Sequence, residues 1–302
     1  MWAHPLAPLA FAGLAGAVWY AAAASGPAGV WYDAQESHFF LLPPILADVA
    51  PSWVKFSTMD FFGSVGCCAS YRAKLEGLGR RAPWFGALAT CCIMQFGGTT
   101  LVGLLLGQPA SWTLSHNAPR SLLLAFWLVF ACPGDVFYRG FRAFWPARLF
   151  FTLGAAVSSG HAITSWGVDK ALNAMHERAR TAVFSTLIAG TFGASGGGLC
   201  VVALDLWGEG AGRPRTYGAL QKAAVGSLVY YILRDPHDTF DYVALSATQA
   251  RLCIGVYSVI GAAIPELFTN ADHLTPHRLL ETAIRTVVNV PAYVGAPRDK
   301  TA

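Results

Sequence analysis

Long apolar runs, separated by short polar segments, make up most of the sequence. No Asp, Glu, Lys or Arg occurs between Arg81 and Arg120, a stretch longer than the about 20 residues that cross a bilayer as a helix. After a first apolar run at residues 5–24, seven more follow at residues 54–71, 84–106, 121–133, 144–168, 181–204, 217–233 and 252–265. This pattern predicts an all-α membrane protein with seven transmembrane helices in its core.

The composition agrees with this class of protein. Hydrophobic residues make up 54% of the chain and charged residues 13%, whereas a soluble domain is about 25% charged. The net charge of +4 does not indicate nucleic-acid binding, because the basic residues stand singly or in pairs between apolar runs. The seven cysteines show no CxxC spacing and nearly all lie within apolar runs. Neither a metal site nor a disulfide framework is therefore predicted, and no cofactor is expected.

The N-terminal run leaves two interpretations open. Residues 1–25 are either a signal peptide or an additional transmembrane helix, because the run ends in small residues but residues 1–4 carry no Lys or Arg. The expected boundaries beyond it are a linker at 26–53, a three-helix repeat at 54–143, a second repeat at 144–240, a seventh helix at 241–268 and a tail at 269–302. Lys and Arg concentrate in the loops after the first, third and fifth core runs, which predicts a cytosolic tail.

Two features recur about a hundred residues apart and indicate an internal repeat. The third core run ends in Pro133-Gly134-Asp135, and the sixth is followed by Pro236-His237-Asp238. The run before each contains clustered glycines, which are Gly97 and Gly98 in the second run and Gly196, Gly197 and Gly198 in the fifth. A unit of three helices crosses the membrane an odd number of times, so the second unit is expected to be inverted. Inverted repeats with glycine-interrupted helices are typical of pathways for ions or solutes.

The candidate pathway residues are these glycines and one lysine. The glycines are expected to break their helices beside a pathway, although close helix packing is the alternative. Lys222 lies near the start of the sixth run, where it is either a pore-facing or gating charge or a side chain that reaches back to the interface. For Arg148, near the start of the fourth run, the interfacial position is favoured.

Ser195 raises an enzymatic alternative. Gly193-Ala194-Ser195-Gly196 matches the GxSG motif of rhomboid intramembrane proteases. A serine nucleophile needs a histidine base, but no rhomboid-like Ala-His-x-Gly-Gly follows. The downstream histidines lie in a predicted loop and in the tail. Ser195 is therefore interpreted as a small residue at a helix interface beside the pathway, and the chain is not expected to be an enzyme.

The chain resembles the trimeric intracellular cation channel (TRIC) family. Three segments carry the resemblance: Phe96-Gly97-Gly98, the sequence LLLGQP at 104–109, and Cys132-Pro133-Gly134-Asp135 with Tyr138-Arg139. They are similar to the family's FGG, LLLGEP and CPxDxxYK motifs. The resemblance implies two inverted three-helix repeats plus one helix, and a pore in each protomer of a homotrimer. It also implies a multi-pass protein of the endoplasmic or sarcoplasmic reticulum membrane, whose potassium flux balances calcium release.

One departure from the family concerns lipid binding. The resemblance implies a KEV-type motif that supplies a lysine and an arginine to the pore and to an anionic inositol lipid, but residues 154–159 here read GAAVSS. This argues against inositol-lipid binding by the family's mode. Arg148 is the nearest substitute, and Arg139 and Arg142 are further candidates for contact with membrane lipids.

The working hypothesis is a homotrimeric channel for potassium ions. A secondary transporter is an alternative, because the same inverted repeat serves alternating access. A non-catalytic membrane scaffold is another, and it predicts that changes at Lys222 and at the glycines affect folding but no flux.

Overall fold

The computed structural model describes residues 57–114, 116–175, 183–206, 216–234, 245–268 and 275–279, and these residues form helices joined by turns, without strands. The long helices are α4 (Thr58–Gly77), α5 (Trp84–Leu106), α8 (Trp145–Ile163), α11 (Val183–Ala203), α12 (Thr216–Arg234) and α13 (Ala247–Leu267). The shorter elements are η1 (Ser111–Thr113), α6 (Asn117–Phe126), η2 (Trp127–Ala131), η3 (Pro133–Asp135), α7 (Val136–Ala143), η4 (Thr164–Asp169) and α9 (Lys170–Ala174). Each core run predicted from the sequence overlaps one of the long helices or α6, and α4, α6, α12 and α13 extend beyond the predicted run. The N-terminal run, Pro236 and Asp238 lie outside the described residues.

Local sequence signals fix several helix ends. The hydroxyl of Ser57 accepts a hydrogen bond from the backbone N–H of Asp60 and caps α4, and Ser246 with Gln249 forms a capping box at the start of α13. The helix α5 begins directly after Pro83 and ends at Gly107, whose φ of 63° lies in the left-handed region. The ends of these helices therefore follow from ordinary capping chemistry.

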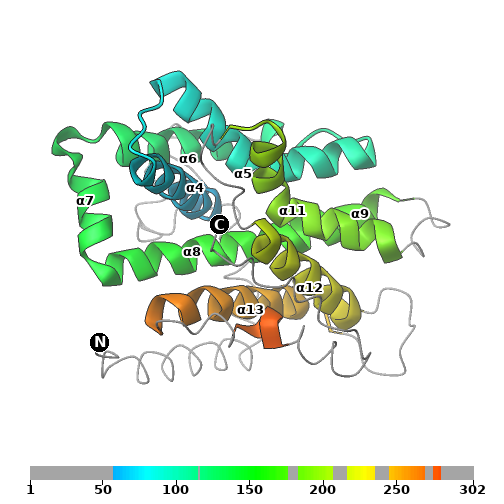
Figure 1. Ribbon diagram of the computed structural model, residues 1–302. Coiled ribbons are helices and arrows are strands. Elements are labelled where there is room, and N and C mark those ends of the chain that lie inside the picture. The colour runs from blue at the N-terminus through cyan, green and yellow to red at the C-terminus, as the bar shows by residue number, and fades with distance from the viewer. Residues whose placement is uncertain are drawn as a thin grey trace, which may run out of the picture.

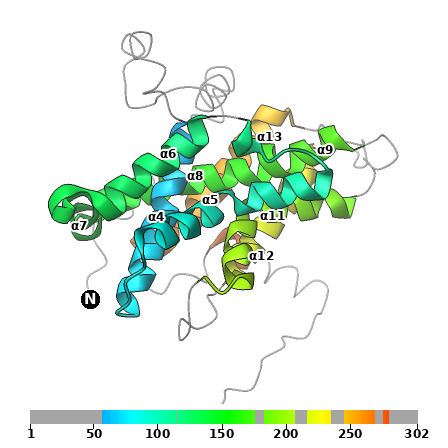
Figure 2. The same cartoon turned by 90° about the horizontal axis from the view of Figure 1, so that it is seen from above.

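The helix α8 occupies the middle of the molecule (Figure 1). It packs against α13 on one side and against α4 on the other, and it also contacts α11, which in turn packs against α5. The helix α12 lies against α11 and α13. Seen from above, α5 and α11 lie side by side along much of their length (Figure 2).

The chain bends sharply after α6. The last residues of this helical segment, Trp127–Ala131, are π-helical, and the axis then turns by 80° into the helical segment Pro133–Ala143. Gly134 and Asp135 both adopt left-handed backbone conformations, with φ of 65° and 58°. Glycine does so freely, whereas an aspartate there needs support from its surroundings.

Three of the described helices are long and apolar enough to cross a membrane, namely α5, α11 and α13, and the bent pair α6–α7 would make a fourth. The helix α4 differs from these three in carrying four charged residues, which are Asp60, Arg72, Lys74 and Glu76. Threonine and serine hydroxyls inside the helices bond to carbonyls one turn earlier, as Thr90 does to Gly86 and Ser227 to Ala223. This satisfies hydroxyl groups without water, as an apolar surrounding requires.

Candidate functional site

The clustered glycines bring α5 and α11 into close contact. A Cβ atom on Gly97 would lie 3.0 Å from the Cα of Gly197, and one on Gly196 would lie 2.7 Å from the Cα of Gly98. A Cβ on Gly197 would overlap the carbonyl oxygen of Met94. The obstructing atoms belong to the backbone, so they cannot move aside as a flexible side chain could. The two predicted repeats therefore meet at their glycine clusters.

The expectation that these glycines break their helices is wrong. Both α5 and α11 run as continuous α-helices through Gly97, Gly98 and residues 196–198. The physical reason is that the opposing helix fills the space that side chains at Gly97, Gly98, Gly196 and Gly197 would need, and so holds these residues in a helical backbone. Gly198 differs from its neighbours, because a Cβ there would meet nothing within 4 Å.

A cavity of about 610 Å³ extends along the helix contact. Its walls come from α4, α5, α8 and α11, and the lining includes Gly98, Gln95, Ser158 and Gly197. At one end the lining carries charge, from Arg142, Arg148 and Glu266. The rest of the lining is uncharged and mixes apolar side chains with small polar ones, and three of its residues, Ala155, Ser158 and Ser159, come from the segment at 154–159.

A second cavity, of about 330 Å³, lies at the other end of α4. Ser57, Asp60, Ser111 and Asn117 are among its lining residues. The first cavity follows α4 from Gly63 to Ala73, so the two together accompany nearly all of this 20-residue helix. A helix of that length is about 30 Å long, which is the thickness of the hydrocarbon core of a bilayer.

The arginines at the first cavity's charged end are paired with carboxylates. Arg148 Nε lies 2.9 Å from Glu266 Oε2, and Arg142 Nη1 lies 2.6 Å from Glu76 Oε2. The side chains of Arg148 and Arg142 are 41% and 60% exposed, so solvent screens both pairs. Both guanidinium groups are therefore accessible at the surface.

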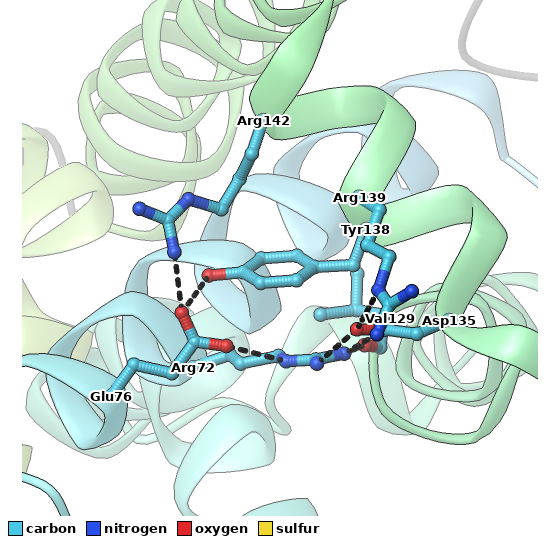
Figure 3. A network of polar contacts seen from close by, with 7 residues as sticks. All are labelled: Arg72, Glu76, Val129, Asp135, Tyr138, Arg139 and Arg142. Carbon is cyan, nitrogen blue, oxygen red and sulfur yellow. Dashed lines mark hydrogen bonds and ion pairs between the residues drawn. The ribbon is translucent and has the colours of Figure 1, made fainter.

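Arg142 belongs to a larger network that joins α4 to the bend after α6 (Figure 3). Two nitrogen atoms of Arg72 each lie 2.6 Å from an oxygen of Asp135, and Arg72 also donates to the backbone carbonyl of Val129. The guanidinium stacks over the ring of Tyr138 at 3.9 Å. The paired contacts hold Asp135 in its left-handed conformation and thereby fix the angle of α7.

Glu76 connects the other half of this network. It accepts hydrogen bonds from Tyr138 Oη at 3.3 Å and from Arg72 Nε at 3.2 Å (Figure 3). Burial and the Glu76 carboxylate raise the pKa of Tyr138, so this hydroxyl keeps its proton and donates it. Arg139 lies farther out, with Nε 3.8 Å from Asp135 and a side chain that is 78% exposed.

A second ion cluster lies at the far end of the α8 segment. The buried carboxylate of Asp169, in η4, accepts hydrogen bonds from Tyr230 Oη at 2.8 and 2.9 Å and from Arg251 at 2.9 and 3.0 Å. Arg234 Nε approaches it to 4.0 Å. Because Tyr230 and Arg234 belong to α12 and Arg251 to α13, this one carboxylate ties both helices to η4.

The remaining predicted residues lie apart from the cavities. Lys222 is on α12 and faces α13, where its Nζ is 3.4 Å from the carbonyl oxygen of Ser258. It is not among the residues that line either cavity. Ser195 donates its hydroxyl hydrogen to the carbonyl of Thr191 at 2.6 Å, and among the described residues this is the bond that its side chain makes. Ser195 thus uses its hydroxyl within its own helix, α11, where the residue is buried.

Sequence reasoning missed the partners in both ion clusters. Arg72, Asp169 and Arg251 each flank an apolar run, where charged residues are expected as boundary markers, so they attracted no further interpretation. The one available signal was the Pro-Gly-Asp motif at Asp135, which marks a turn but does not reveal Arg72, 63 positions earlier. Asp60 was visible as a charge inside a predicted span, but nothing in the pattern placed it beside a cavity.

Comparisons with known proteins agree with this architecture. A structure of a trimeric intracellular cation channel from C. elegans in the absence of Ca²⁺ is 22% identical, with a TM-score of 0.56, and the match covers 70% of this chain and 90% of that one. A C. elegans channel structure with bound Ca²⁺ is 19% identical, with a TM-score of 0.54 and coverage of 68% and 90%. A structure from work on TRIC counter-ion channels in calcium release is 19% identical, with a TM-score of 0.54 and coverage of 70% and 94%.

These structural matches establish a shared fold, and a sequence match identifies the family. No curated protein sequence matches the chain. The sequence model described as TRIC channel matches residues 78–257, which is more than half of the 302 residues. The match includes both glycine clusters, the Asp135 bend and the Asp169 cluster. This chain therefore belongs to the TRIC channel family.

Proposed function

We propose that the protein conducts monovalent cations, with potassium as the physiological ion, along the two cavities beside α4. The observation that carries the proposal is that the cavities follow opposite parts of one membrane-length helix and meet at shared lining residues, Thr99 and Trp166. Between its charged ends the path is lined by uncharged residues, which include the hydroxyl groups of Ser158 and Ser159 and the amide of Gln95. Such groups can replace part of an ion's hydration shell without trapping it.

The charged residues at the two ends of the path favour cations as the permeant ions. At the first end, Arg148 and Arg142 are paired with Glu266 and Glu76. At the second end, Asp60 places a carboxylate next to the cavity. A carboxylate at a pore mouth raises the local concentration of cations and lowers that of anions.

The membrane arrangement is part of the proposal. Seven core helices cross the membrane as two inverted repeats plus α13, with α4 and α8 as equivalents and α5 and α11 as equivalents. Two contacts support this arrangement, because α4 packs on α8 and α5 packs on α11, as helices related by a shared pseudo-two-fold axis would. The bend with Arg142 and the start of α8 then face the cytosol, by the positive-inside rule.

The assembly and the location follow the related channels. We propose a homotrimer with one path in each protomer, in the endoplasmic or sarcoplasmic reticulum membrane, where potassium flux balances the charge moved by calcium release. Arg139, Arg142 and Arg148 are the proposed contacts for anionic lipids, since all three reach the surface at the same end. Lys222 is proposed as a gating charge that acts through α13.

Planar bilayer recording of the purified full-length protein tests the function. In a potassium chloride gradient, discrete openings with a reversal potential close to the potassium equilibrium potential are expected. Openings that reverse at the chloride potential would contradict cation selectivity. Saturable uptake that depends on a proton or sodium gradient, without discrete openings, would identify a secondary transporter instead.

A further inference from the structure

Trp166 stands where the two cavities meet. It lines both of them, and Thr99 on α5 is the one other residue that they have in common. The remaining lining residues belong to one cavity or the other. At this point the indole side chain lies between the two cavities of the proposed path.

The position of the Trp166 backbone is fixed on both sides. Trp166 belongs to the π-helical segment η4, and π-helical turns often occur at functional sites. The next residue, Gly167, lies so close to α11 that a Cβ on it would be 2.9 Å from the carbonyl oxygen of Ala189. Three residues after Trp166, Asp169 is hydrogen-bonded to Tyr230 and Arg251. The segment is therefore anchored to α11, α12 and α13.

The ring of Trp166 has one well-defined aromatic contact. The imidazole of His161, a buried residue on α8, meets the indole edge-on, with ring centroids 4.9 Å apart and an interplanar angle of 85°. The indole itself is only partly buried, since part of its surface faces the cavities. The indole is thus held by His161 on one side and borders the two cavities on another.

We propose that Trp166 is the residue that limits permeation through the path, and that its indole closes the junction opposite Thr99. A large apolar ring at a narrow point excludes water, and an ion cannot cross a dewetted constriction. The anchored η4 segment keeps the ring at this position, and a small rotation of the side chain away from Thr99 joins the cavities. This inference rests on the proposed conduction function and places the narrowest point of the path at Trp166.

Replacement of the ring by a methyl group tests this assignment. Trp166→Ala is expected to raise the single-channel conductance or the open probability by about twofold or more, because the partition is removed. Trp166→Phe retains an aromatic ring against His161 and is expected to give an intermediate value. The matched control is Trp127→Ala, which removes a half-exposed tryptophan that lines neither cavity.

The possible results separate this inference from the proposed function. Conduction by the wild type that is unchanged in both Trp166 variants would overturn the assignment of Trp166 and leave the channel function standing. No cation current from the wild type or from any variant would overturn the channel function itself. Current that rises from wild type to Trp166→Phe to Trp166→Ala, with Trp127→Ala at the wild-type level, supports both.

Thiol accessibility gives a readout that does not depend on current. Ser159 lines the first cavity, so Ser159→Cys, in a background with the seven native cysteines replaced by alanine, reports entry into that cavity. A membrane-impermeant trimethylammonium-ethyl methanethiosulfonate added from the side of Asp60 is expected to modify it slowly. Trp166→Ala should speed that reaction by about tenfold or more, as expected for loss of a dewetted barrier. Equal rates with and without the indole would overturn the assignment.

Discussion

Arg72 and Asp135, which are 63 positions apart in the sequence, are joined by two hydrogen bonds of 2.6 Å. This bidentate pair connects the end of α4 to the bend between α6 and α7, and it supports a left-handed aspartate. Arginine is suited to this contact because its planar guanidinium matches both carboxylate oxygens at once.

Loss of this pair is expected to destabilise the fold. Asp135→Ala should lower the free energy of unfolding by about 1–3 kcal/mol, because it leaves Arg72 without its main acceptor. Thermal unfolding of the detergent-solubilised protein, followed by size-exclusion chromatography, measures the effect. Arg139→Ala serves as the control, since its exposed guanidinium touches the same carboxylate only at 3.8 Å. Equal losses for the two variants would contradict a specific role for Arg72.

The glycine contact predicts opposite effects at adjacent positions. Gly197→Ala should destabilise the protein by about 1–3 kcal/mol, because the new methyl group would overlap the backbone of α5 at Met94. Gly198→Ala should stabilise it by about 0.5–1 kcal/mol, because alanine favours a helix and nothing lies in the way. The same thermal assay compares them. A tolerated Gly197→Ala would mean that the helices can separate at little cost.

The Asp169 cluster provides a graded test. Asp169→Asn should cost about 3 kcal/mol or more, because it leaves the guanidinium of Arg251 beside an uncharged amide in a largely buried site. Tyr230→Phe removes only one hydrogen-bond donor and should cost about 1 kcal/mol. Unfolding temperatures measured in parallel distinguish the two. A cost for Tyr230→Phe as large as that for Asp169→Asn would assign the stability to ring packing rather than to charge.

Asp60→Asn is expected to reduce cation conductance and the preference for cations over anions. The effect should be larger at low salt than at about 1 M salt, where the screening length falls to about 3 Å, and it should persist in part because the Asp60 side chain is buried. Bilayer recordings across a salt series test this. Asp205→Asn removes the same charge at the exposed end of α11, away from both cavities, and should change neither property.

Lys222→Gln should separate gating from permeation. Because Lys222 lines neither cavity, the single-channel conductance should stay the same. If the charge crosses the membrane field during gating, its removal weakens the voltage dependence by up to about 2.3 kcal/mol per 100 mV. Lys222→Arg keeps the charge and should retain the voltage dependence. A change in conductance without a change in voltage dependence would contradict a gating role.

The helices were predictable from the sequence because each core run is apolar over the length of a helix. The predicted and observed helix boundaries agree where a residue that ends helices marks them, as Pro83 and Gly107 do for α5. The glycine clusters were also singled out, but as helix breaks, with close helix packing as the alternative that the structure supports. Glycines in a helix favour both bending and close approach, and only the position of the opposing backbone decides between them.

The residues at the junction were not predictable in the same way. Trp166 lies in a run of apolar and small residues, where a tryptophan has the appearance of an ordinary core or lipid-facing side chain. Its position depends on the π-helical turn in η4, which shifts the register of the helix and leaves no mark in the hydrophobic pattern. Pairings over long sequence distances, such as Asp169 with Arg251, likewise depend on how the helices pack.

The contact between α5 and α11 has a consequence for biosynthesis. During translation, α5 emerges well before α11, yet its glycine face is complete only when α11 packs against it. The glycine face of α5 therefore stays uncovered in the membrane until residues 183–203, which form α11, have been inserted. A premature stop before α11 would leave that surface permanently uncovered, so truncated products are expected to be substrates for membrane quality control rather than stable half-channels.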